Sequence, residues 1–206
     1  MTTRILIADD HKIVRDGLKR ILAGSELEVA AEAASGDEAL ALVKAQSFDI
    51  ALVDMSMPGL SGIALVKRLK EERPKMKVLV LSMHGEHQYA ARALKAGASG
   101  YLTKDSAADQ LLGALRKIAA GGVHISDAAA SALVASPAGA SHESLSDREF
   151  EVMRLLVEGL GPSEIGEKLH LSVKTVSTHK TRILEKLGLG STAELVRYAL
   201  ENKLLD

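Results

Sequence analysis

The sequence predicts an α/β fold, a doubly wound five-stranded parallel sheet, followed by a second, smaller all-α domain. Two observations support this prediction. Between residues 4 and 120, short apolar runs alternate five times with segments of helical periodicity, and repeated βα units of this kind form a parallel sheet. From Ser146 onward only the helical periodicity remains, which is typical of a helical domain.

Polar side chains follow four of the apolar runs, at the point where each predicted strand ends. Asp9 and Asp10 follow the first run, and Asp54, Ser82 and Lys104 follow three later ones. Near-continuous apolar runs are typical of parallel strands that are buried on both faces. Because ligands bind outside the carboxyl ends of such strands, we expect these five side chains to converge on one site.

The helices of the first domain are predicted from periodicity and from capping residues. Ser35, Ser61 and Ser106 stand at N-cap positions, and Gly24 and Gly97 stand where helices end. The predicted helices span residues 12–23, 37–45, 62–72, 88–96 and 107–120.

The composition of the chain changes after the last of these helices. Gly121 and Gly122 precede a short predicted helix at 127–134 and a breaker-rich stretch at 135–141, which is typical of a linker. We therefore expect a first domain at 1–120, a linker with a short helix at 121–143 and a second domain at 144–206.

Four helices are predicted in the second domain, at residues 147–158, 162–169, 173–187 and 192–202. Ser146 with Glu149, and Ser191 with Glu194, fit capping boxes at the start of two of them. The second and third helices are separated by about three residues, which is the connection of a helix-turn-helix.

The strand-end carboxylates predict a phosphate-accepting site that depends on a divalent cation. Asp54 is the expected nucleophile, because a carboxylate can accept a phosphoryl group when a cation neutralises the phosphate oxygens. The expected metal ligands are Asp9, Asp10, Asp54 and the backbone carbonyl of Ser56, since Mg²⁺ prefers hard oxygen ligands. The alternative is that Asp9 and Asp10 only cap the first helix.

Two further strand-end residues have the right chemistry to contact a phosphoryl group. Lys104 offers a positive charge and Ser82 a hydroxyl donor. Lys104 taken alone is more typical of a solvated loop lysine, so its assignment depends on its position after a predicted strand.

Residues 1–120 resemble the receiver domain of two-component response regulators of the NarL/FixJ branch, whose fold is flavodoxin-like. The resemblance is carried by residues 5–11, 54–59, 81–84 and 97–104. It implies that a sensor histidine kinase phosphorylates Asp54 and that Asp9 and Asp10 bind the metal. It also implies a phosphoryl-sensing switch, in which Ser82 moves toward the phosphoryl group and Tyr101 turns inward, together with the lysine at position 104.

Residues 145–187 resemble the LuxR-type helix-turn-helix, through the stretches 145–152, 164–169 and 172–179. Residues 124–206 hold more acids than bases, but between positions 168 and 186 five bases accompany a single acid, Glu185. A local basic patch of this kind is what contact with DNA phosphates requires.

Helical projection separates two faces of the helix at 173–187. The expected buried stripe is Val173, Val176, Ile183, Leu184 and Leu187. The opposite face carries short polar and basic side chains, as a helix in the major groove requires. The expected contacts to base edges are Ser177, Thr178 and Thr181. The expected phosphate contacts, which position the protein without specifying a DNA sequence, are Lys174, Thr175 and Arg182.

Composition excludes several kinds of site. The chain has no cysteine, which removes disulfides, thiolate metal sites and cysteine nucleophiles. No apolar stretch approaches the roughly 20 residues that span a bilayer, and no apolar signal segment begins the chain. We therefore expect a cytoplasmic location and no membrane partner.

These observations predict a phosphorylation-controlled, DNA-binding transcriptional regulator rather than an enzyme. The expected partners are a sensor histidine kinase, double-stranded DNA and, after phosphorylation, a second copy of the chain in a homodimer. Two alternatives stay open: a phosphohydrolase, which normally carries a second Asp where Ser56 stands, and a binding module that no longer takes phosphate. A dinucleotide-binding domain is disfavoured, because no G-x-G-x-x-G follows the first strand.

Overall fold

The computed structural model describes residues 2–57, 60, 62–82, 86–125, 142–202 and 204. The chain forms two compact units, Met1–Ala135 and Ser136–Asp206, and each is described by itself. The predicted N-cap at Ser61, the short helix at 127–134 and the breaker-rich stretch at 135–141 lie outside the described residues.

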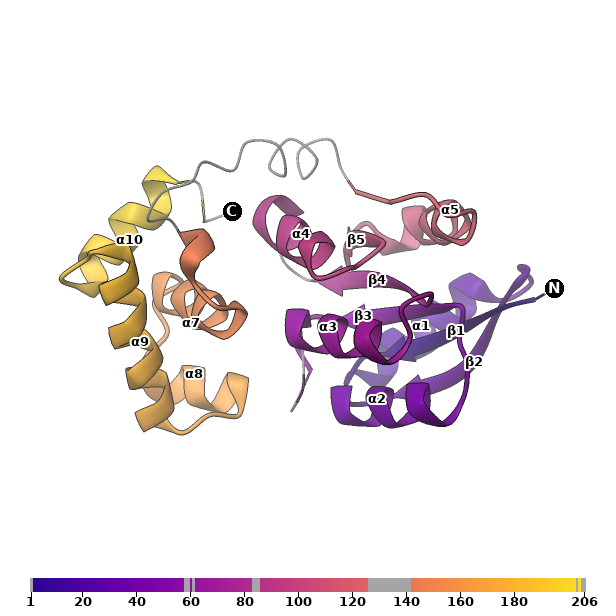
Figure 1. The fold of residues 1–206 in the computed structure, drawn as a ribbon, viewed down its shortest axis with the longest axis horizontal. Coiled ribbons are helices and arrows are strands. Elements are labelled where there is room, and N and C mark those ends of the chain that lie inside the picture. The colour runs from indigo at the N-terminus through magenta and orange to yellow at the C-terminus, as the bar shows by residue number, and fades with distance from the viewer. Residues whose placement is uncertain are drawn as a thin grey trace. The chain divides into compact units, whose positions relative to one another are not determined.

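The first unit is a parallel sheet flanked by helices (Figure 1). Its strands are β1 (Thr3–Ala8), β2 (Leu27–Ala33), β3 (Ile50–Asp54), β4 (Lys77–Ser82) and β5 (Gly100–Thr103), in the order β2-β1-β3-β4-β5. Its helices are α1 (Lys12–Leu22), α2 (Gly36–Ala45), α3 (Gly62–Glu72), α4 (Glu86–Lys95) and α5 (Ala107–Ala119). The predicted doubly wound five-stranded parallel sheet is therefore confirmed.

The sheet is buried on both faces. Successive side chains of a strand point to opposite faces, so each strand contributes to two layers of the core. On one face, Ile7 and Leu52 pack in a single cluster with Leu18 of α1 and Leu115 of α5. Their neighbours along the strands, such as Val53, are equally buried. Burial on both sides explains why the strands appear in the sequence as continuous apolar runs.

The predicted caps of the first unit are partly right. Ser35 caps α2 by accepting a backbone N–H with its hydroxyl, and Gly24 and Gly97 adopt the left-handed conformation expected after a helix. Ser106 stands at the predicted N-cap position of α5, but its side chain does not cap the helix. Its hydroxyl accepts no capping bond and instead donates to the carbonyl of Thr103 at 3.0 Å, because the residue already has helical backbone angles.

The second unit is helical. It consists of η1 (His142–Ser144), α7 (Asp147–Val157), α8 (Pro162–Leu169), α9 (Val173–Leu187) and α10 (Thr192–Glu201). The capping box of Ser146 and Glu149 is confirmed in both directions. At α10 only half of the predicted box forms, because the carboxylate of Glu194 accepts the N–H of Gly190 rather than that of Ser191. Among the described residues, no helix has the length and apolar character needed to cross a membrane.

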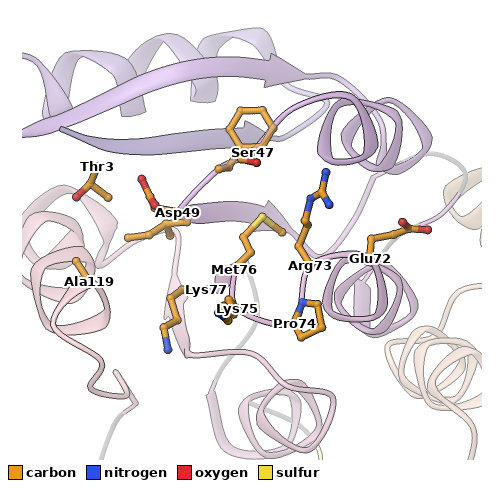
Figure 2. Close-up of a pocket in the computed structure, with 12 residues that line it drawn as sticks. Thr3, Ser47, Asp49, Glu72, Arg73, Pro74, Lys75, Met76, Lys77 and Ala119 are labelled. Atoms are coloured by element: carbon orange, nitrogen blue, oxygen red, sulfur yellow. The ribbon is translucent and has the colours of Figure 1, made fainter. Parts of the chain in front are cut away.

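A cavity of about 620 Å³ lies at the amino-terminal edge of the sheet, beside the starts of β1, β3 and β4 (Figure 2). Its lining mixes both signs of charge, with Asp49 and Glu72 facing the same space as Arg73 and Lys77. The strand ends that carry the predicted acidic site lie at the opposite edge. The cavity is therefore separate from that site.

Candidate functional site

Three strand ends that are far apart in the sequence meet at the carboxyl edge of the sheet. The ammonium of Lys104, just after β5, lies 2.7 Å from Oδ2 of Asp9 and 3.0 Å from Oδ2 of Asp54. Asp9 follows β1 and Asp54 ends β3, and the two side chains are only 1% and 2% exposed. The structure thus brings together three of the five residues that the strand-end argument predicted to converge.

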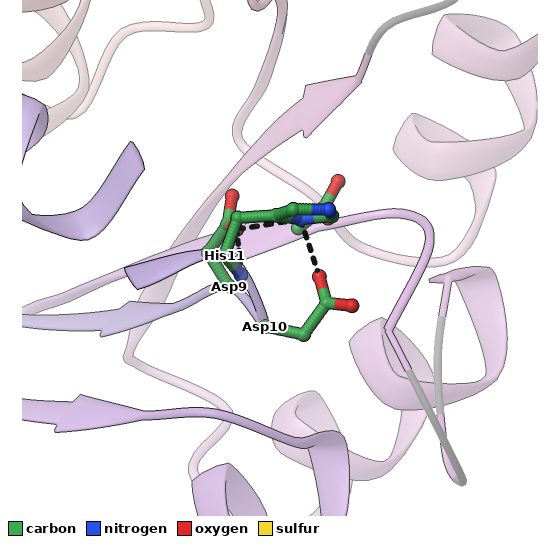
Figure 3. A group of neighbouring side chains, drawn as sticks. Asp9, Asp10 and His11 are labelled. Atoms are coloured by element: carbon green, nitrogen blue, oxygen red, sulfur yellow. Dashed lines mark hydrogen bonds and ion pairs between the residues drawn. The ribbon is translucent and has the colours of Figure 1, made fainter. Parts of the chain in front are cut away.

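Asp10 and His11 form the outer rim of this cluster (Figure 3). Nδ1 of His11 lies 2.8 Å from Oδ1 of Asp10, and the backbone N–H of His11 donates to Oδ1 of Asp9 at 2.8 Å. One ligand atom from each of Asp9, Asp10, His11 and Asp54 can be chosen so that all lie within 4.8 Å of one another. His11 is 62% exposed, so the cluster is closed toward the sheet and open toward solvent.

The electrostatics of the cluster favour a bound cation. Burial raises the pKa of Asp54, and the neighbouring Asp9 adds to this rise while the Lys104 ammonium and a backbone hydrogen bond from Ser56 oppose it. Burial alone would lower the pKa of Lys104, but its hydrogen bonds and ion pairs with the two carboxylates outweigh burial and raise it. Lys104 pairs with two carboxylates, and the third carboxylate of the cluster, that of Asp10, adds negative charge that this ammonium does not offset.

Two predicted switch residues, Ser82 and Tyr101, are buried. Ser82 ends β4, and its carbonyl accepts the backbone N–H of Lys104 at 2.7 Å, which ties the lysine loop to the strand. Tyr101 on β5 is 1% exposed. The predicted inward turn of Tyr101 is therefore not a change from this state, because the ring already lies inside. Ser56, the predicted carbonyl ligand, is exposed and lies in the loop after β3.

The second unit contains the predicted helix-turn-helix. α8 and α9 are joined by the three residues His170–Ser172, and His170 has a positive φ of 53°. The turn packs tightly on α8. The backbone N–H of Leu171 donates to the carbonyl oxygen of Gly166 at 2.8 Å. A Cβ on Gly166 would lie only 2.7 Å from the carbonyl oxygen of Leu171. Glycine is therefore required for this close approach.

The six predicted DNA-contact residues lie on α9 and are all exposed. The hydroxyls of Ser177, Thr178 and Thr181 donate to carbonyls four residues earlier, at 3.0, 2.9 and 3.2 Å. Since their protons point inward, these oxygens present lone pairs outward, as acceptors. Thr175 contacts the N-cap Ser172 through its hydroxyl, at 2.7 Å.

The predicted buried stripe of α9 is only partly correct. Val176, Ile183 and Leu187 are buried, and Leu184 is half-buried. The prediction for Val173 was wrong, since this residue is 49% exposed. Helical projection treats a first helical residue like an interior one, although it has a neighbouring turn on one side only.

One ion pair of the second unit was missed in the sequence. Nζ of Lys186, near the end of α9, lies 2.6 Å from the buried carboxylate of Glu149 at the start of α7. Burial would raise the pKa of Glu149, but the hydrogen bonds from Lys186 and Ser146 outweigh it and lower the pKa to about 2. The capping box predicted the place of Glu149, but nothing in the pattern named Lys186 as its partner. Lys186 itself is exposed, so it lies on the surface of the unit while its ammonium pairs with a buried carboxylate.

Two protein-family models match the chain. The response regulator receiver domain matches residues 5–116, and the bacterial regulatory proteins of the luxR family match residues 143–199. The first match covers more than half of the chain, and the two matches fall on the two structural units.

Similar proteins extend over nearly the whole length. Oxygen regulatory protein NreC of Staphylococcus haemolyticus (strain JCSC1435) is 40% identical over 215 residues, covering 98% of this chain and 99% of that protein. A solved structure of RcsB from Salmonella enterica serovar Typhimurium, bound to promoter rprA with the phosphomimetic BeF3⁻, is 30% identical, covers 95% of this chain and 98% of that chain, and has a TM-score of 0.66. The structure of the response regulator ChrA of a heme-sensing two-component system is 31% identical. The match covers 100% of both chains and has a TM-score of 0.53.

The chain therefore belongs to the NarL/FixJ family of two-component response regulators. These are transcription regulators in which a receiver domain is joined to a LuxR-type helix-turn-helix that binds DNA.

Proposed function

We propose that Asp54 is the phosphoryl acceptor of the receiver domain and that its phosphorylation controls DNA binding by the second domain. The observation that carries this proposal is the buried contact of Lys104 with both Asp9 and Asp54. The donor is the phosphohistidine of a sensor histidine kinase. Its N–P bond breaks, a bond forms between phosphorus and a carboxylate oxygen of Asp54, and the ring nitrogen keeps the electron pair and takes a proton.

The residues that would hold Mg²⁺ are Asp9, Asp10, Asp54 and the carbonyl of Ser56. Their fit rests on the donor chemistry, because carboxylate oxygens gathered within 4.8 Å of one another suit a hard divalent cation. When bound, the cation supplies positive charge against the phosphate oxygens.

The chain's own residues supply the remaining electrostatics. Phosphorylation converts the charge of Asp54 into a phosphoryl dianion. The Lys104 ammonium, already 3.0 Å from Asp54, then pairs with a phosphoryl oxygen, and the hydroxyl of Ser82 donates to another. Tyr101, already buried, is held inside by this rearrangement rather than moved there. The surface built by β4, β5 and the helices that follow them then differs between the two states.

The output is binding of double-stranded DNA by α9. Ser177, Thr178 and Thr181 contact base edges, where their outward lone pairs accept from base amino groups. The phosphate contacts are Lys174, Thr175 and Arg182. A linker at 121–143 joins the two domains, and phosphorylation favours a homodimer on a two-part DNA site in the cytoplasm. The promoter-bound structure of RcsB with a phosphomimetic supports this proposal.

Labelling with acetyl phosphate and Mg²⁺ tests the acceptor. Asp54→Asn keeps the shape of the side chain but removes the nucleophile, so the aspartyl-phosphate should disappear. Asp49→Asn is the matched control, since Asp49 precedes the same strand at its opposite end and is exposed. Labelling of Asp54→Asn at the wild-type level would contradict the assignment. Steady turnover of p-nitrophenyl phosphate by the wild type would favour the phosphohydrolase alternative.

A further inference from the structure

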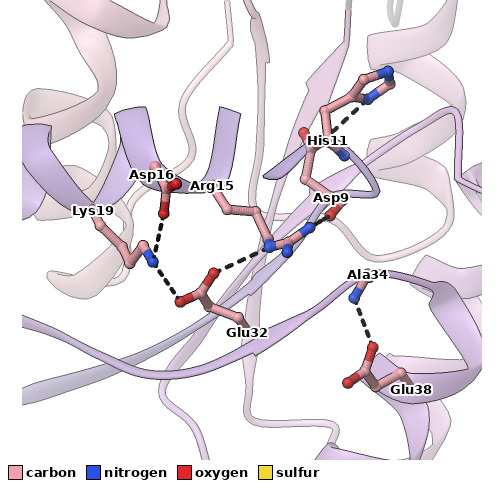
Figure 4. Close-up of polar contacts among 8 residues, drawn as sticks. All are labelled: Asp9, His11, Arg15, Asp16, Lys19, Glu32, Ala34 and Glu38. Atoms are coloured by element: carbon pink, nitrogen blue, oxygen red, sulfur yellow. Dashed lines mark hydrogen bonds and ion pairs between the residues drawn. The ribbon is translucent and has the colours of Figure 1, made fainter. Parts of the chain in front are cut away.

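Arg15 connects helix α1 to the backbone of the acidic loop, the segment after β1 that carries Asp9 and Asp10 (Figure 4). Its Nη1 donates to the carbonyl oxygen of Asp9 at 2.7 Å, and its Nε donates to Oε2 of Glu32 on β2 at 3.1 Å. The Arg15 side chain is only 14% exposed. A single side chain thus spans a helix, a neighbouring strand and the loop that carries the carboxylates.

Local geometry explains why Arg15 reaches this loop. Helical side chains lean toward the amino terminus of their helix, so a residue in the first turn of α1 points back over the residues that precede it. Asp9 lies just beyond the end of β1, and its N–H makes a last ladder bond with Ala33 at 3.1 Å. Its carbonyl lies beyond the paired part of the strand and is satisfied by the guanidinium, as a buried backbone acceptor requires.

Glu32, which accepts from Nε of Arg15, is itself held in place by a further ion pair. Glu32 also lies 2.7 Å from the ammonium of Lys19, which in turn lies 2.8 Å from Asp16 (Figure 4). The hydrogen bond from Lys19, assisted by the one from Arg15, lowers the pKa of Glu32. Glu32 is therefore anionic at neutral pH and anchors Arg15 to the sheet.

We propose that Arg15 is a positioning residue for the divalent-cation site, which fixes the peptide plane between Asp9 and Asp10. A peptide unit is planar, so holding its carbonyl also fixes the directions in which the two flanking residues leave it. Both flanking side chains are metal ligands in the proposed function, on which this inference rests. Arg15 touches neither the cation nor the phosphoryl group and acts through the backbone.

A role through charge and a role through positioning predict opposite changes in Mg²⁺ affinity when Arg15 is replaced. A guanidinium near a cation site repels the cation, so if Arg15 acted only through its charge, Arg15→Met would tighten Mg²⁺ binding. If it positions the loop, Arg15→Met should weaken Mg²⁺ binding about 10-fold or more, as is usual for residues that orient metal ligands. Arg15→Lys keeps the charge but loses the planar, two-sided donor, so it should also bind Mg²⁺ more weakly than the wild type.

The experiment is calorimetric titration of the full chain with Mg²⁺ alone, with circular dichroism of each variant as a check of folding. The matched control is Arg116→Met. Arg116 also forms an ion pair with a glutamate of the first unit, Glu26, at 2.8 Å, although this pair is more exposed and includes no residue of the acidic loop. Its loss should leave Mg²⁺ affinity unchanged within about twofold, since the pair lies outside the site.

The outcomes separate the two proposals. If the wild type binds no Mg²⁺ and takes no phosphoryl group, the proposed function fails. If the wild type binds Mg²⁺ and Arg15→Met binds it equally or more tightly, the positioning role is overturned and the proposed function stands. If Arg15→Met does not fold, Arg15→Lys decides: weaker binding supports the role, and wild-type binding overturns it.

Discussion

Most functional side chains of the acidic site are buried, whereas the side chains of α9 that we propose to contact DNA are exposed. Asp9, Asp54 and Ser82 are almost completely buried, and they come from the ends of three strands. The residues proposed to contact DNA are exposed and come from one helix. Chemistry on a small group needs fixed geometry away from water, while recognition of a polymer needs an accessible surface.

This difference decides what a substitution can change. A side chain in the acidic site is packed, charged and coupled to its neighbours, so replacing it alters both chemistry and stability. A side chain on the outward face of α9 contacts little of its own domain, so replacing it should alter DNA binding alone.

The largest expected effect is that of Lys104→Met. Removing the ammonium leaves no fixed positive side chain against the phosphoryl oxygens, and the loss of one such preorganised charge costs about 10²-fold in rate. The initial rate of acetyl phosphate labelling at saturating Mg²⁺ measures this. Lys77→Met, at the start rather than beyond the end of a strand, is the control. An unchanged rate for Lys104→Met would remove the lysine from the phosphoryl site.

Glu149→Gln should destabilise the second unit by about 1–3 kcal/mol, because it breaks a charged hydrogen bond to Lys186. The folded pKa of about 2 lies below the ordinary value of 4.5, so the pair's stabilisation is complete above 4.5 and is lost as the pH falls toward 2. The difference in unfolding free energy between wild type and variant should therefore shrink over that range. Glu185→Gln, on the exposed side of α9, should change little. A difference independent of pH would contradict the role of the ion pair.

Asp54→Asn should stabilise the first unit at neutral pH without Mg²⁺. The folded pKa of Asp54 is raised, chiefly by burial, so the charged form costs stability above that pKa and this cost fades as the pH falls. The melting temperature should rise by a few degrees, the shift that about 1 kcal/mol produces. Thermal scans at several pH values measure this, with Asp49→Asn as control. A lower melting temperature for Asp54→Asn would show that the buried carboxylate does not destabilise the folded unit.

The smallest expected effect is that of Lys174→Ala. Loss of one phosphate contact should lower the salt dependence of DNA affinity by about one unit of slope and leave the melting temperature unchanged. Titrations of DNA binding at several salt concentrations measure the slope. If only the melting temperature changed, Lys174 would belong to the interior of the domain rather than to its DNA-contact face.

The same contrast explains what could be predicted from the sequence. The acidic site follows from strand ends, because parallel topology brings Asp9, Asp54 and Lys104 to one edge without knowledge of packing. The bond from Arg15 to the Asp9 carbonyl could not be predicted, since every residue offers a backbone acceptor and only the packed helix selects one. Val173 was wrongly predicted to be buried, because periodicity indicates which face of the helix a residue occupies but not whether another element packs against it.

The most direct test of the central claim is the DNA affinity of the full chain with and without BeF3⁻ and Mg²⁺. The protein and Asp54→Asn would be compared on a duplex selected from a random library with BeF3⁻-treated wild type. The claim predicts that BeF3⁻ changes the affinity of the wild type by about 5–150-fold, the range typical of coupling between two sites, and leaves Asp54→Asn unchanged. An equal response of both proteins, or no response of the wild type, would contradict it.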